Sequence, residues 1–172
     1  MRRRLYHGTD REFEEFQFAG LGVHFGTKEQ AIDRMESRYH RERGRIVVAN
    51  VCIKNPLRMD DVHLWQLPKF VVPGLLNTGL WTEEDVGHIP RDPNDPPEVA
   101  LSGLAMIKEL IVAKGFDGIV YGNVGEGKRV KDSFVAFEPH QVAILSHGRE
   151  LPLAGRQNGH GCASVSCQAR RL

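Results

Sequence analysis

The alternation of apolar and polar positions along the chain predicts a series of short β-strands with a few helices between them. Residues 45–53 are rich in β-branched side chains and carry the clearest strand pattern. Shorter patterns of the same kind recur along the rest of the chain. They predict further strands at residues 4–6, 20–25, 116–121, 132–138 and 141–146.

A first helix is predicted over residues 28 to about 41. Thr27 is placed to cap its start, because the side chain of Gln30, three positions later, can reach back to the cap amide. The apolar stripe of this helix repeats at helical spacing through Ala31, Met35 and Tyr39.

A second helix is predicted over residues 99–114. Gly115 is placed to end it, since glycine readily adopts the left-handed conformation that follows many helices. The expected apolar stripe runs through Leu101, Leu104, Ile107 and Ile111. A shorter helix carrying Trp65 is expected at residues 60–70.

Four segments predict irregular structure. Asn55-Pro56-Leu57 predicts a turn. The acidic, proline-rich residues 82–98 predict a long surface loop, of the length that often forms a lid or a binding element. Residues 122–131 predict a glycine-rich loop, and the polar composition after residue 153 predicts a flexible tail over residues 154–172.

Composition and pattern together indicate a single domain over residues 1–153. Strands outnumber helices, which favours an α+β fold over a regular α/β fold with a parallel sheet. The 172 residues carry 41% hydrophobic and 26% charged side chains, as globular proteins do. A formal net charge of +1 gives no global field that would attract nucleic acid or an anionic membrane.

The cysteines and the N-terminus predict a soluble, reduced, cytoplasmic chain without a metal. Cys52, Cys162 and Cys167 are odd in number and lack the spacing of a metal site or a disulfide framework. The basic start Arg2-Arg3-Arg4 lacks the apolar run of a signal peptide. No window has the apolar length of a membrane span.

Two motifs near the start of the chain combine histidine, glycine and threonine. Tyr6-His7-Gly8-Thr9 ends the first predicted strand, and Gly22-Val23-His24-Phe25-Gly26-Thr27 covers the second. A histidine beside a glycine at a strand end places an imidazole next to an exposed backbone amide. Such a pair is suited to hold a carboxamide or a ribose hydroxyl.

Further pieces follow in a fixed order: residues 51–60 around Asn55-Pro56-Leu57, residues 115–123 with Glu126, and residues 132–142. Each piece alone is a weak motif, but their order makes coincidence unexpected. With the two histidine motifs, they make residues 4–146 resemble the small ADP-ribosyltransferase domains of phages, mobile elements and bacterial toxins.

The resemblance implies two small β-sheets with flanking helices, split around a cleft that holds NAD. It implies cleavage of NAD between nicotinamide and ribose, with transfer of ADP-ribose to a macromolecule, in the cytoplasm or in a host cytoplasm. A protein acceptor is the family default. Nucleic acid is the alternative, suggested by the basic residues Arg38, Arg41, Arg43 and Arg45.

The resemblance also assigns roles to particular residues. His7 and Gly8 match the family's His-Gly pair, Thr9 extends it, and Phe25 is a candidate to stack on nicotinamide. Arg34 is expected to lie near the cleft mouth, where the NAD pyrophosphate needs a cation. The full set expected to bind NAD is His7, Gly8, Thr9, His24, Phe25, Gly26, Thr27 and Arg34.

The chain departs from the family pattern at two positions. Ser133 stands where the family carries its catalytic glutamate. Glu126 is therefore the favoured catalytic carboxylate, and Asp132 is the alternative. The expected catalytic set is His7, Glu126 and Ser133. The family tyrosine after the second strand is also missing, and Asp33 or Arg34 falls near its place. These departures leave two alternatives open: an NAD glycohydrolase, and a degenerate transferase fold that acts as a binding module.

Overall fold

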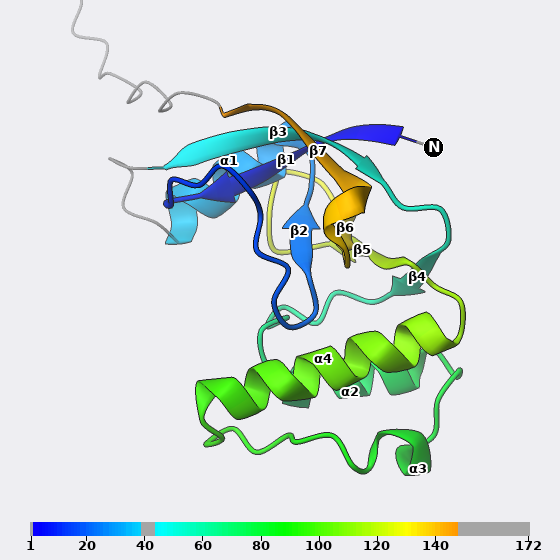
Figure 1. Cartoon of the computed structure of the whole chain (residues 1–172). Coiled ribbons are helices and arrows are strands. Elements are labelled where there is room, and N and C mark those ends of the chain that lie inside the picture. Colours follow the sequence, from blue (N-terminus) through cyan, green and yellow to red (C-terminus); the bar gives the residue numbers. More distant parts are fainter. Residues whose placement is uncertain (1, 39–43, 148–172) are drawn as a thin grey trace, which may run out of the picture.

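The computed structural model describes residues 2–38 and 44–147, and these form an α+β fold with two sheets and four α-helices (Figure 1). The α+β prediction is confirmed. The residues predicted as a tail, 154–172, lie outside the described part. In chain order the elements are β1 Arg2–Thr9, β2 Val23–Phe25, α1 Lys28–Arg38, β3 Arg45–Cys52, β4 Pro56–Met59, α2 Pro68–Asn77, α3 Glu83–Val86, α4 Pro97–Ala113, β5 Gly118–Asn123, β6 Lys131–Ala136, the 3₁₀ turn Pro139–Gln141, and β7 Val142–His147.

The two sheets differ in size and in strand direction. The first sheet has the order β1-β3-β7 and is antiparallel. The second has the order β2-β6-β5-β4, and β4 runs parallel to β5. Figure 1 shows the first sheet at one end of the molecule, α2 and α4 side by side near the other end, and the second sheet between them.

The second sheet is covered on both faces. Toward the first sheet it buries an apolar layer made by Leu5, Val23, Phe25, Ala49, Val51, Val120, Phe134 and Ala136. Toward the helices it buries a larger layer that includes Ile119, Tyr121, Val135, Trp65, Val72, Leu75, Leu104, Ile107 and Ile111. Helix α1 packs against the first sheet through Ala31, Met35 and Ile46. The removal of this apolar area from water is the main favourable term that holds the layers together.

A single β-bridge joins the two sheets where the histidine motifs lie. Tyr6 and Gly26 exchange two backbone hydrogen bonds, each with an N···O distance of 2.9 Å. Close packing explains two glycines of the motifs. A Cβ on Gly8 would lie 2.5 Å from the Ala31 carbonyl oxygen, and one on Gly26 would lie 2.6 Å from Gln30 Oε1.

The predicted cap of the first helix is confirmed. Thr27 Oγ1 accepts from the Gln30 backbone N–H at 3.2 Å, and Gln30 Oε1 accepts from the Thr27 backbone N–H at 2.7 Å. This reciprocal pair is a capping box. The described helix ends at Arg38, and the remainder of its predicted length lies outside the described residues.

The second predicted helix corresponds to α4, and its glycine end is confirmed. Gly115 has a φ of +87°, its N–H bonds to the Val112 carbonyl, and the Phe116 N–H bonds to the Ile111 carbonyl. This pattern is a Schellman motif. One member of the predicted stripe is wrong: Leu101 is 47% exposed. It lies in the first part of α4, whereas the core begins at Leu104.

The predictions for residues 55–70 are correct only in part. The chain bends at Lys54 and Asn55 after β3, as predicted, but Pro56 and Leu57 belong to strand β4, where Pro56 pairs with Gly118. The chain from residue 60 to Leu67 is irregular, and helix α2 starts at Pro68. Proline is favoured at the first position of a helix because a backbone N–H at that position has no acceptor within the helix, so no hydrogen bond is lost when proline lacks it.

Two further boundaries differ from the prediction. The second strand begins at Val23 instead of residue 20, because Gly20 and Gly22 have φ values of +57° and +128° and turn the chain. The predicted loop at residues 82–98 holds the short helix α3, which starts at a second capping box formed by Thr82 and Asp85. Helix α4 then begins at Pro97, within the predicted loop.

Candidate functional site

Residues from six parts of the chain meet near the helix-side face of the second sheet. Tyr121 and Asn123 are two positions apart on β5, and Tyr121 is paired with Ser133 on β6, so their side chains share one face. His24 on β2 faces the same way and contacts Tyr121. The loop after β5 contributes Glu126, α1 contributes Arg34, and β1 contributes His7.

The Glu126 carboxylate is held from two sides. Arg34 Nη1 lies 3.1 Å from Oε1, and Asn123 Nδ2 donates to Oε2 at 2.9 Å. The Glu126 side chain is 17% exposed. Asn123 also donates to Ser133 Oγ at 3.1 Å, and its Oδ1 accepts from the backbone N–H of Gly125 and of Glu126. Asn123 therefore fixes Glu126 and Ser133 relative to one another.

Helix α1 ties down the glycine-rich loop through two adjacent residues. Asp33 Oδ2 accepts from the Gly127 N–H at 3.0 Å, and Arg34 pairs with Glu126. Gly127 has a φ of +84°, which glycine adopts without steric cost. Asp33 and Arg34, the two residues near the place of the missing family tyrosine, thus both anchor the loop that carries Glu126.

The hydrogen bonds of His7 assign its protons. Its Nδ1 lies 2.8 Å from the His24 carbonyl oxygen, so Nδ1 carries a hydrogen and donates. Burial lowers the pKa of His7, the hydrogen bond to His24 opposes this, and the charge of Arg34 lowers it further. In the neutral ring Nε2 is then an acceptor, suited to receive a hydroxyl hydrogen.

Burial and a contact with Tyr121 determine the state of His24. Burial lowers the pKa of His24 to about 3 and raises the pKa of Tyr121, so both groups are neutral at pH 7. The Tyr121 hydroxyl lies 3.2 Å from His24 Nδ1, within hydrogen-bond distance. Because a hydroxyl can donate or accept, this contact is compatible with a proton on either nitrogen of the His24 ring.

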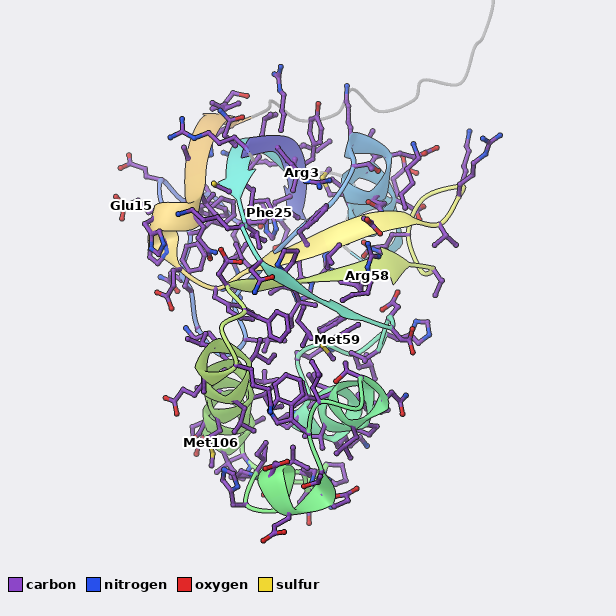
Figure 2. All side chains as sticks on the ribbon, turned by 90° about the vertical axis from the view of Figure 1, so that its right-hand side faces the viewer. Arg3, Glu15, Phe25, Arg58, Met59 and Met106 are labelled. Carbon is purple, nitrogen blue, oxygen red and sulfur yellow. The ribbon has the colours of Figure 1, made fainter. Side chains whose placement is uncertain are left out.

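Aromatic rings surround both histidines. The His7 ring lies edge-on to Phe16 at a centroid distance of 5.2 Å and tilted against Phe25 at 5.9 Å. Phe25 is 2% exposed and belongs to the apolar layer between the two sheets, where Figure 2 labels it. The Trp65 ring lies 5.5 Å from His24 and 4.5 Å from Tyr121.

Three adjoining spaces meet at His24 and Arg34. The outer cleft, of about 480 Å³, lies between the ends of β1 and β2 and residues 11–17 and is also lined by His7 and Thr9. A side pocket of about 200 Å³ lies beside Trp65 and the start of α4. The inner pocket, which Glu126 and Ser133 line, measures about 20 Å³. A space of that size holds about one water molecule.

The other predicted residues have structural partners. Thr27 caps α1, and Thr9 Oγ1 accepts from the Arg11 N–H at 3.1 Å while Thr9 lines the outer cleft. Gly8 and Gly26 line the inner pocket where α1 approaches closely. Their part in NAD binding stays a prediction.

The alternative carboxylate, Asp132, lies away from the site. It neighbours Ser133 on β6, so its side chain points to the opposite face of the sheet. There Arg58 holds it with two bonds of 2.7 and 3.0 Å, on the side of the molecule that faces the viewer in Figure 2. The hydrogen bond from Arg58 lowers the pKa of Asp132. Glu126 is the carboxylate that reaches the inner pocket.

Tyr121 and Trp65, which contact His24, were not among the residues predicted for the site. Tyr121 could have been found from strand alternation, because it lies two positions before Asn123 on a strand that leads to the glycine-rich loop. No sequence pattern indicated that Trp65 would lie at the site. It is held by Asp61, which accepts from Trp65 Nε1 at 3.2 Å and from the Val124 backbone N–H at 3.1 Å.

The described part of the chain contains neither a cluster of metal ligands nor a membrane-spanning helix. Over residues 2–38 and 44–147, no three His, Cys, Asp or Glu side chains are grouped so that they could hold a metal ion. Within the same residues, no helix combines the length and the apolar character needed to cross a bilayer.

Comparisons with known proteins give one distant structural neighbour. No family model matches the chain, and no curated protein matches it either. The neighbour is described as the crystal structure of an anti-CRISPR protein, with 15% identity and a TM-score of 0.39. The match covers 84% of this chain and 94% of that one. A likeness at this level does not bear on function.

The buried His24 predicts a loss of stability in acid. Its folded pKa of about 3 lies below the ordinary value of 6.5, so the unfolded chain takes up a proton that the folded chain excludes. Stability is therefore complete above pH 6.5 and falls as the pH drops toward 3, by up to about 1.4 kcal/mol per pH unit. Urea unfolding between pH 7 and 4 would measure this slope. His24→Gln should flatten it, and an unchanged slope would contradict the assignment.

Proposed function

We propose that this protein is an NAD-dependent ADP-ribosyltransferase that modifies a macromolecular acceptor, with a protein favoured over a nucleic acid. One observation carries the proposal. The Glu126 carboxylate, held by Arg34 and Asn123, lies at the inner end of a cleft between two sheets, beside His7 and His24. These are the residues that the sequence resemblance assigns to the reaction, and the fold gathers them from distant parts of the chain.

The chemistry follows from the charge that develops on the ribose. The bond between the ribose carbon and the nicotinamide nitrogen breaks, and nicotinamide leaves with the bonding electron pair as a neutral molecule. The ribose becomes oxocarbenium-like, and a nearby carboxylate stabilises that positive charge. A nucleophile of the acceptor then bonds to the ribose carbon and loses its proton to Glu126 or to solvent.

The two histidines and Arg34 provide complementary contacts for the nucleotide. His7 Nε2 is an acceptor for a ribose hydroxyl, and the His24 ring lines the same inner pocket. Arg34 and Arg11 line the outer cleft, together with Glu15 and with Glu12, which pairs with Arg45. The pyrophosphate is therefore placed beside Arg34, the cation nearest the inner pocket. At about 480 Å³ the outer cleft is within the range of small-molecule sites, and in the proposed complex it holds the ADP-ribose part of NAD.

Nicotinamide requires the inner pocket to widen. At about 20 Å³ the pocket excludes the ring while Glu126 stays paired with Arg34. Binding therefore separates the glycine-rich loop from α1, and the pyrophosphate replaces Glu126 as the partner of Arg34. Gly125 and Gly127 give the loop the backbone freedom for this motion.

Incubation of the purified protein with adenylate-labelled NAD and a bacterial lysate tests the proposal. Label retained in macromolecules and lost after protease digestion supports a protein-directed transferase, and label lost after nuclease digestion supports a nucleic-acid-directed one. Release of nicotinamide without retained label would identify an NAD glycohydrolase instead. If NAD stays intact, the enzyme proposal is overturned and the binding-module alternative takes its place.

A further inference from the structure

A second groove, of about 350 Å³, lies outside the candidate site, between residues 14–18 and strand β7. Its floor is apolar and is formed by Phe16, Phe18, Pro139, Val142 and Ile144. Two carboxylates, Glu14 and Glu15, stand at its rim. We refer to these seven residues as the acidic groove. Figure 2 shows Glu15 at the edge of the molecule, beside β7.

The side chains of the acidic groove select a particular kind of ligand. Glu14 and Glu15 are exposed, and neither makes an ion pair with any residue that the structure describes. An apolar floor below two carboxylates suits a side chain with a long alkyl stem and a cationic head. Lysine and arginine have this form, since their stems pack on apolar surface while the head stays in water.

The position of β7 indicates an extended backbone for this ligand. Strand β7 forms the edge of the first sheet, and in the described structure it pairs with β3 alone. An edge strand offers unpaired N–H and C=O groups to an added strand. Val142 and Ile144 of β7 line the groove, so alternate side chains of an added strand would lie over it.

The acidic groove shares a wall with the outer cleft. Glu15 and Phe16 line both spaces. The Phe16 ring packs at 5.2 Å from both His7 and Phe25, so the segment that bounds the groove also bounds the candidate site. A chain docked in the groove would therefore run close to the cleft mouth.

We propose that the acidic groove docks an extended basic segment of the acceptor protein, which adds to the edge of β7 and places a lysine or arginine against Glu14 and Glu15. The term acceptor rests on the proposed transferase function, whereas the docking itself does not. Charge complementarity favours a basic peptide, because two carboxylates would repel the phosphates of a nucleic acid.

Binding of short peptides without NAD tests the docking directly. The probe is a blocked peptide that alternates valine with arginine, and its control carries glutamine in place of each arginine. The arginine peptide should bind about tenfold more tightly, and Glu14→Lys should remove that preference while Glu84→Lys on the distant helix α3 keeps it. Amide NMR shifts should change at Val142–Ile144. Equal binding of both peptides, shifts confined to other residues, or tighter binding of a single-stranded oligonucleotide at this groove would overturn the proposal.

A labelling experiment connects the groove to the acceptor. With labelled NAD and lysate, Glu14→Lys should reduce protein labelling about tenfold and leave the slow release of nicotinamide into water unchanged, because Glu14 lines the groove and not the cleft. Unchanged labelling would overturn the groove as the acceptor site. If the wild type leaves NAD intact but the peptide binds as expected, the transferase proposal fails and the docking stands.

Discussion

Glu126→Gln should lower the release of nicotinamide from NAD by about a thousandfold while NAD binds at least as tightly, because Arg34 no longer has to give up an ion pair to bind the pyrophosphate. Glutamine keeps the size of the side chain and a hydrogen-bonding partner for Asn123, but it removes the negative charge that faces the ribose. Two unit charges about 4 Å apart attract by about 4 kcal/mol at an effective dielectric constant of about 20, which corresponds to a thousandfold change in rate. Nicotinamide release and calorimetric titration with NAD measure the two quantities separately.

Asp132→Asn is the matched control, because it neutralises a carboxylate on the opposite face of β6 that pairs with Arg58. This variant should keep the wild-type rate. A normal rate in Glu126→Gln together with a loss in Asp132→Asn would show that the wrong carboxylate was chosen. Loss in both variants, with normal folding, would show that the reaction depends on charge at both faces of the sheet.

Local signals predicted the elements that depend on local interactions. The capping box of Thr27 and Gln30 and the glycine end at Gly115 each involve residues a few positions apart, and the structure contains both. The wrong predictions fall where distant contacts decide. Asp117 accepts from the backbone N–H groups of Lys54 and Asn55, more than sixty positions away, and so leads the chain into β4 where a turn was predicted.

The candidate site was also predictable where it depends on local motifs, and not where it depends on contacts between distant residues. His7, His24 and Glu126 belong to the sequence motifs described above, and all three side chains line the inner pocket. The contribution of Tyr121 depends on the register of β5 against β6, which pairs it with Ser133. That register is set by the buried layers on both faces of the second sheet, and no short pattern encodes it.

The two departures from the family pattern involve residues that lie close together in the structure. Asp33 and Arg34, near the place of the missing tyrosine, hold the loop that carries Glu126. Ser133, at the position of the family glutamate, accepts from Asn123, which also binds Glu126. The proposed function requires the two contacts from α1 to this loop, Asp33 with Gly127 and Arg34 with Glu126, to separate.

Gly22→Ala should destabilise the protein by about 3 kcal/mol or more. Gly22 has a φ of +128°, and a Cβ at this position would lie 2.2 Å from the Ala136 carbonyl oxygen. The substitution therefore combines a backbone conformation that alanine avoids with a clash against the backbone of β6. Since Gly22 borders the outer cleft and the side pocket, any shift that relieves the clash also moves His24. The midpoint of urea unfolding measures the loss.

Gly79→Ala is a control for a positive φ without a clash. Gly79 has a φ of +72°, close to the left-handed region that alanine can enter, and no atom lies within 4 Å of its missing Cβ. This control should cost about 1 kcal/mol. The larger loss expected for Gly22→Ala has two sources: a φ of +128° lies outside that region, and the Ala136 carbonyl leaves no room for a methyl group between β2 and β6. Equal losses in the two variants would contradict both.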